Sequence, residues 1–137
     1  RTCAGCHTDV AGFRAGTLTG WARGALPKDA MADAVDCEGC HELSAPTTLE
    51  AIDKKCTECH SDEESRFRGM LTSWSSEVDR LVGEVAARNR DTDRALLQAL
   101  RRAGPIHNIE ATRSIARELL AQPSDRTSDQ RSSPRVP

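Results

Sequence analysis

The chain has 137 residues and a formal net charge of −2, and its aromatic side chains are two Phe and two Trp, with no Tyr. Such a chain buries little aromatic surface from its own side chains, and its charge gives no reason to expect nucleic acid as a partner. It has no apolar run long enough to span a bilayer, so membrane association is expected only through a partner or a missing N-terminal segment.

One five-residue pattern, C-x-x-C-H, occurs three times and uses all six cysteines and three of the four histidines. This spacing is the attachment signature of c-type haem, in which two thiols bond to the porphyrin and the adjacent imidazole binds the iron. The sequence therefore predicts three covalently attached c-type haems. The predicted attachment residues are Cys3, Cys6, Cys37, Cys40, Cys56 and Cys59, and the predicted iron ligands are His7, His41 and His60.

Two other uses of the cysteines fit part of this pattern. Fifteen residues separate Cys40 from Cys56, which is also the spacing of a four-thiolate zinc site. That site would leave Cys3 and Cys6 without partners. A scaffold of three disulfides is the other alternative. Neither alternative explains why a histidine follows every second cysteine, so haem attachment is the preferred interpretation.

Haem attachment has consequences for folding and location. Three haems would supply the apolar bulk that the side chains lack, so the first 60 residues are expected to be largely disordered without the cofactor. Attachment takes place outside the bacterial cytoplasm, so the protein is expected to be periplasmic or extracellular. No signal peptide is present at the start of the chain, and one is expected to have preceded Arg1. Because the first motif begins at residue 3, we expect missing upstream sequence or contact with another subunit there.

Residues 1–62 form the predicted trihaem-binding segment, which is rich in loops. Between residues 11 and 27, a glycine occurs at every fourth position from Gly12 to Gly24, so a loop is expected, with one short helical turn after His7. Trp21 stands alone in this loop and is expected to cover a haem edge or a subunit contact.

Met31 lies six residues before Cys37, where many multihaem cytochromes place the histidine that is the distal iron ligand. A thioether can bind haem iron and raises its reduction potential relative to a second imidazole. Met31 is therefore a candidate distal ligand. The alternative is that its flexible side chain packs on the porphyrin.

Residues 63–122 are predicted to form helices that pack on the haems as a hairpin. Apolar residues from Phe67 to Val85 recur at spacings of three and four, which indicates a long amphipathic helix starting near Glu63. A break is expected near residues 90–93, with Asp91 capping a second segment that contains three leucines. The polar face of the long helix is expected to carry Glu77, Asp79, Arg80, Glu84 and Arg88.

Gly104 and Pro105 are expected to end the second segment, and Pro105 to begin a last amphipathic helix that ends near Pro123. Residues 123–137 are rich in Ser, Arg, Asp and Pro and are predicted to be disordered or bound to a partner. The predicted fold is mainly α, with a loop-rich N-terminal half organised by haem and no significant β-sheet.

His107 is the fourth histidine and lies at the start of the last helix. Three irons have six axial positions, and the motifs fill three of them. Because imidazole is the usual sixth ligand of electron-transfer haems, His107 is predicted to be a distal ligand.

These features resemble periplasmic multihaem cytochromes c. The resemblance is carried by the three motifs, by Arg68 to Leu71 with Trp74, and by the segment from Gly104 to Asn108, and it covers about residues 1–121. The His-Asn pair that opens a helix is similar to the C-terminal helix of cytochromes related to pentahaem nitrite reductase and hydroxylamine oxidoreductase. This likeness implies that His107 is a distal ligand. The chain lacks a Lys-ended motif, has no Tyr for a crosslink and has fewer haem sites than either enzyme.

The ligand count bears on the function. With His107 and Met31, five of six axial positions have a candidate, and the last would come from missing sequence, from a partner, or would be open. An electron carrier needs filled positions, whereas an enzyme needs one open iron. The expected function is relay of electrons between protein partners or subunits of a redox complex. The alternative is a subunit of a redox enzyme that acts on a small nitrogen or sulfur species.

Overall fold

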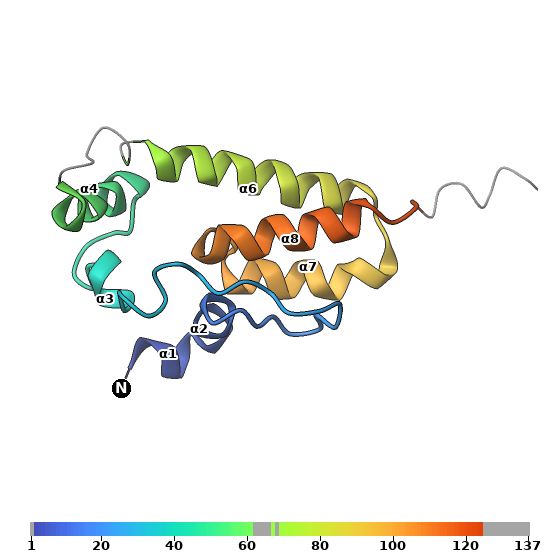
Figure 1. The fold of residues 1–137 in the computed structure, drawn as a ribbon, viewed down its shortest axis with the longest axis horizontal. Coiled ribbons are helices and arrows are strands. Elements are labelled where there is room, and N and C mark those ends of the chain that lie inside the picture. Colours follow the sequence, from blue (N-terminus) through green and yellow to red (C-terminus); the bar gives the residue numbers. More distant parts are fainter. Residues whose placement is uncertain (1, 62–66, 68, 125–137) are drawn as a thin grey trace, which may run out of the picture.

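The computed structural model describes residues 2–61, 67 and 69–124. Within these residues the chain is mainly helical and has no strand, which confirms the predicted fold class. Four helices lie in the N-terminal half and four helical elements in the C-terminal half (Figure 1). The first set is α1 (Cys3–Cys6), α2 (Thr8–Arg14), α3 (Cys37–Cys40) and α4 (Leu49–Cys59). The second is α6 (Met70–Ala87), α7 (Asp91–Ala103), the 3-10 turn η2 (Pro105–Asn108) and α8 (Ile109–Leu120).

The three long C-terminal helices form a bundle, in which α8 packs along α6 and shares a hydrophobic core with α7 (Figure 1). Helix α2 packs on α7, whereas α3 and α4 lie at one end of the bundle. None of the described helices is long and apolar enough to cross a membrane.

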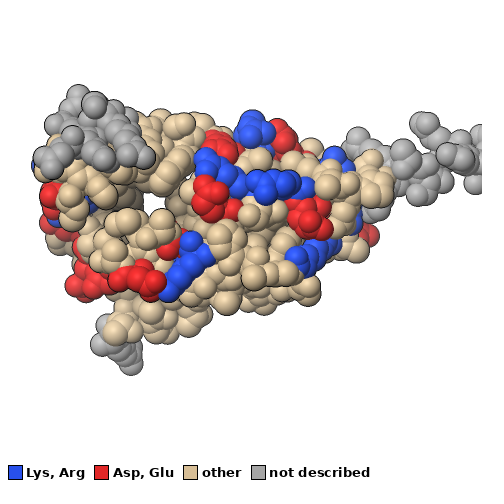
Figure 2. All heavy atoms as spheres, viewed as in Figure 1, with Lys and Arg blue, Asp and Glu red and all other residues tan. Residues whose placement is uncertain are grey.

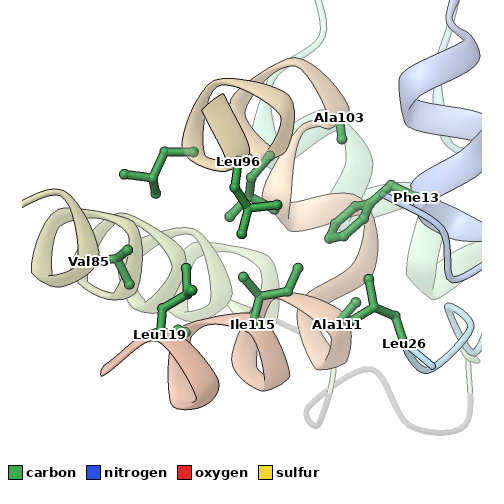
Figure 3. Close-up of a cluster of buried hydrophobic side chains, with 11 residues drawn as sticks. Phe13, Leu26, Val85, Leu96, Ala103, Ala111, Ile115 and Leu119 are labelled. Atoms are coloured by element: carbon green, nitrogen blue, oxygen red, sulfur yellow. The ribbon is translucent and has the colours of Figure 1, made fainter. Parts of the chain in front are cut away.

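The hydrophobic core joins the bundle to the N-terminal half of the chain (Figure 3). Phe13 of α2 is fully buried, and Leu26 of the following loop is 8% exposed. Trp21 packs against the same cluster, and its indole Nε1 donates a hydrogen bond to the Gly24 carbonyl at 2.9 Å. The remaining members of the cluster are Val85, Leu96, Leu97, Leu100, Ala103, Ala111, Ile115, Ala116 and Leu119.

The glycine-rich loop folds back to the end of α2 because Gly16 allows the backbone at Leu26 to approach closely. Gly16 has φ +85°, and a Cβ at this position would lie 2.8 Å from the Leu26 carbonyl oxygen. The amide of Asp29 donates a hydrogen bond to the Arg14 carbonyl at 2.8 Å, so the loop closes at the end of α2. This closure brings Leu26 into the core.

The predicted apolar stripe of the long helix is confirmed, since Leu71, Val78 and Val85 are its buried residues. The predicted start near Glu63 lies outside the described residues, and α6 begins at Met70. Two residues assigned to the outer face contact α8 or the residues after it instead. Glu77 pairs with Arg113, and Arg88 donates to the Gln122 carbonyl.

The break between α6 and α7 occurs where it was expected, but Asp91 does not cap the second helix. Arg90 is the N-cap residue and makes no side-chain capping bond. Asp91 is already the first helical residue, and its Oδ1 accepts a hydrogen bond from Arg94 at 2.7 Å. A carboxylate in the first turn still interacts favourably with the positive end of the helix dipole.

Gly104 ends α7 with φ +69°, as predicted for the Gly-Pro pair. The last α-helix begins at Ile109 rather than at Pro105, because the four residues from Pro105 to Asn108 form a 3-10 turn. Asn108 caps this helix, since its Oδ1 accepts a hydrogen bond from the Ala111 amide at 3.0 Å. The predicted end near Pro123 agrees with α8, which ends at Leu120, while most of the tail, residues 125–137, lies outside the described residues.

Candidate haem-binding site

Each C-x-x-C-H motif forms the same local structure. In each copy, the two cysteines lie three residues apart in one helical turn, and the histidine is the C-cap residue. The histidine amide donates to the carbonyl of the first cysteine at 2.8, 2.8 and 2.9 Å in the three copies. Side chains three residues apart share one face of a helix. Each turn therefore presents two thiols on one side and places the imidazole at the point where the helix ends.

The six cysteines are free thiols, and all are half-buried or exposed. Among the described residues, no three His, Cys, Asp or Glu side chains gather in a way that could hold a metal ion directly. Paired, accessible thiols beside an imidazole are the donor set that covalent c-type haem requires. The residues present therefore fit this group.

The three motifs approach one another at one end of the molecule. The Cys3 side chain lies near Cys37, and partial burial together with the charges of Cys37 and Glu38 raises the pKa of Cys3. Burial also raises the pKa of Cys56, with a further increase from nearby Cys40. The first motif is thus near the second, and the helices of the second and third motifs, α3 and α4, are in contact, so groups attached at these thiols would be close neighbours.

His107 lies opposite His41, the histidine of the second motif. The two ring centroids are 6.0 Å apart and the ring planes differ by 29°. His107 is half-buried in η2, and this burial, with smaller effects from His41 and Arg14, lowers its pKa. The neutral imidazole, which is the form that can bind a metal, is therefore favoured at this position.

In both of these histidines Nδ1 has a hydrogen-bonding neighbour, and for His107 this neighbour fixes the tautomer. The Nδ1 atom of His107 lies 3.0 Å from the Gly104 carbonyl oxygen, which can only accept, so this nitrogen carries the proton. The Nδ1 atom of His41 lies 3.2 Å from Thr47 Oγ1. The Nε2 atom of His107 therefore has a lone pair that can bind a metal. In His41 the contact with Thr47 uses Nδ1, so Nε2 is not part of it.

The other two motif histidines have different surroundings. His60 stacks on Phe67, with ring centroids 4.3 Å apart and an interplanar angle of 26°. His7 is exposed at the start of α2. Met31, the second predicted distal ligand, is 38% exposed. Its role as a ligand stays a prediction.

Arg14 fixes the segment that leads into the second motif. Its Nε donates to Asp29 Oδ2 at 3.0 Å, and its Nη2 donates to the carbonyls of Met31 at 3.0 Å and Val35 at 2.8 Å. Because the guanidinium donates to three acceptors at once, it holds the turn before Cys37 against α2. Sequence inspection did not identify this residue, because nothing in the local pattern shows that an arginine contacts a segment about twenty residues away.

Asn108 connects three parts of the chain next to His107. Its Nδ2 donates to the carbonyls of Phe13 at 2.9 Å and Pro27 at 2.8 Å, while its Oδ1 caps α8. The side chain is buried, with 1% of its surface exposed, and its hydrogen-bonding groups all have partners. The sequence indicated the helix start at the His-Asn pair but not these long-range bonds.

Comparison with known proteins gives one match. Residues 1–61, slightly less than half of the chain, match the family model described as cytochrome c7 and related cytochrome c. No curated protein and no solved structure gives a significant match. The matched region contains all three C-x-x-C-H motifs. The match therefore supports a multihaem c-type cytochrome that binds haem iron covalently and takes part in electron transfer.

Proposed function

We propose that the chain is a trihaem c-type cytochrome that relays electrons between protein partners outside the cytoplasm, as a subunit or fragment of a larger redox complex. The observation that carries this proposal is the approach of the three motifs to one another, with Cys3 near Cys37 and helix α3 packed on helix α4. Three bound haem irons would supply one-electron oxidation and reduction. The motif turns hold the attachment points together, which suits stepwise transfer within the chain.

The residues of the chain divide this task. In each motif the two cysteines would fix the position of the group, and the histidine at the end of the turn would fill one axial position. His107 and Met31 are the proposed distal ligands. Filled axial positions favour electron transfer because the coordination then changes little between the two oxidation states.

The first test is the haem content and spin state of the protein purified from a host that matures c-type haem. Intact mass spectrometry is expected to find three covalent haems on the chain, and a redox titration is expected to be reversible. Fewer than three haems would contradict the proposed count. A high-spin iron signal that shifts on addition of nitrite, cyanide or hydroxylamine would instead support an enzyme with an open iron.

The role of Met31 has its own test. Substitution Met31→Leu keeps the apolar bulk but removes the sulfur, so it is expected to lower the potential of one haem and to convert one low-spin signal to high spin. As a control, Leu43→Met adds a thioether at an exposed position and should leave the potentials and spin states unchanged. Unchanged potentials in Met31→Leu would show that Met31 is not a ligand.

A further inference from the structure

We infer that His41 and His107 are the two axial ligands of one iron, that of the haem attached at Cys37 and Cys40. This inference rests on the proposed function, since it requires haem at the second motif. It assigns His107, which sequence alone could not assign to any one haem. It also means that the haem of the second motif would connect the N-terminal motifs to the C-terminal bundle.

The separation of the two rings is the first argument. Two imidazoles on opposite faces of one iron have metal–nitrogen bonds of about 2 Å each, and each ring centre lies about 1 Å beyond its nitrogen. The expected distance between ring centres is therefore about 6 Å. The observed distance between the centroids of His41 and His107 is 6.0 Å.

The hydrogen bonds of the two rings are the second argument. Metal-binding histidines usually donate their other ring N–H to a carbonyl or similar acceptor, which fixes the ring and its tautomer. His107 shows this arrangement, since its Nδ1 donates to the Gly104 carbonyl, and Nδ1 of His41 is likewise engaged by Thr47 Oγ1. Both rings therefore have Nε2 as the atom left for iron.

Gly104 supplies the third argument, because its lack of a side chain permits the position of His107. A Cβ at Gly104 would lie 2.5 Å from Nδ1 and 2.9 Å from Cε1 of the His107 ring. The positive φ of +69° at this position also favours glycine. The same residue thus ends α7, accepts the Nδ1 hydrogen bond and leaves space for the ring.

There is also space at this end of the molecule. Figure 2 shows an opening between the surface of α3 and α4 and the surface over α6 and α8. His41 follows α3, and His107 lies in η2 directly before α8.

The test compares electron paramagnetic resonance spectra of the oxidised haem-loaded protein and its His107→Ala variant. One low-spin signal is expected to become high-spin, and added imidazole is expected to restore it. The neighbouring Ile106→Ala variant is the matched control and should keep all signals. If His107→Ala leaves every low-spin signal intact, the inference is wrong, although the relay function can still hold if three haems are attached.

A second comparison tests whether the haem that His107 serves is the one attached at the second motif. In a Cys37→Ala/Cys40→Ala background, which should carry two haems, His107→Ala is expected to change no remaining signal. A further loss of low-spin signal there would mean that His107 serves another haem.

If the Cys37→Ala/Cys40→Ala variant does not incorporate haem, a measurement on the unmodified protein can still show which haem His107 serves. In the reduced, diamagnetic protein, ring protons of His41 and His107 should show nuclear Overhauser contacts to the same haem. Contacts to two different haems would overturn the assignment. If no covalent haem is found at all, the proposed function fails first, and that outcome is distinct from either result.

Discussion

At the scale of single residues, the buried side chain of Asn108 has the most connections near the candidate site. It joins α2, the end of the glycine-rich loop and α8 through hydrogen bonds to Phe13, Pro27 and Ala111. Burial of an amide whose polar groups are all hydrogen-bonded costs little folding free energy, but removal of the side chain leaves its partners without hydrogen bonds. The residue therefore holds the position of its neighbour His107.

Substitution Asn108→Ala is expected to lower the free energy of unfolding by about 2–4 kcal/mol, since the buried Phe13 carbonyl and the partly buried Pro27 carbonyl lose a donor and α8 loses its cap. Urea denaturation of the haem-loaded protein measures this change. Ser114→Ala is the control, because its hydroxyl bonds only to the Glu110 carbonyl at an exposed position. A loss below about 1 kcal/mol for Asn108→Ala would mean that water replaces the amide.

At the scale of elements, Arg14 at the end of α2 holds the segment before the second motif. Arg14→Lys keeps the charge but cannot reach Asp29, Met31 and Val35 together. We expect a loss of about 1–2 kcal/mol in stability and faster amide exchange in residues 29–36. Hydrogen-exchange mass spectrometry checks this, with Arg23→Lys as the exposed control. Unchanged exchange in residues 29–36 would show that α3 is held by other contacts.

The ion pair between Glu77 of α6 and Arg113 of α8 makes a pH-dependent contribution to the free energy of unfolding. The hydrogen bonds at 2.8 and 2.7 Å lower the pKa of Glu77 from its ordinary 4.5, and the side chains are 28% and 32% exposed. A carboxyl whose pKa is lower in the folded state stabilises the fold above its unfolded pKa, and this stabilisation is lost as pH falls through the folded pKa.

Glu77→Gln should therefore cost up to about 1 kcal/mol at pH 7, and the difference from the unmodified protein should shrink between about pH 5 and pH 3. Urea denaturation at several pH values measures this difference. The exposed Arg80–Glu84 pair within α6 is the control, since Glu84→Gln removes only a pair four residues apart on one helix. An equal effect of both substitutions would argue against a specific α6–α8 contact.

At the scale of the whole molecule, the core and the motifs depend on haem to different degrees. Helices α3 and α4 have no buried residue, whereas Phe13 of α2 is fully buried in the bundle core. By the same criterion, the expectation that the first 60 residues need haem to order applies to α1, α3 and α4, none of which has a buried residue, more than to α2. Apolar burial keeps α2 in place, while α3 and α4 have little burial of their own.

A haem-free preparation, made without the maturation system, is expected to keep slow amide exchange in α7, α8 and residues 10–14. Residues 37–59 are expected to exchange within the experimental dead time. Hydrogen exchange followed by mass spectrometry separates these regions. Protection of α3 and α4 without haem would show that the protein part alone specifies the site.

Much of the helical organisation could be predicted from the sequence, because it depends on local patterns. The apolar stripe with Leu71, Val78 and Val85, the break before α7 and the end at Gly104 were all expected and are confirmed. The capping role given to Asp91 was wrong, since a local pattern cannot distinguish a cap from a first helical residue when the neighbour Arg90 already has the extended conformation. The spacing of the motifs likewise determined which cysteines and histidines are candidates for haem.

The tertiary structure decided how these residues meet. His107 lies opposite His41, 66 positions earlier in the chain, because Gly104 turns the backbone and Asn108 ties η2 to α2 and the end of its loop. Arg14 in turn holds the approach to Cys37. Contacts of this kind form between segments that are distant in sequence, so no local periodicity encodes them. The sequence by itself determined the chemistry of the candidate ligands, and the packing of the bundle decided that His41 and His107 face each other.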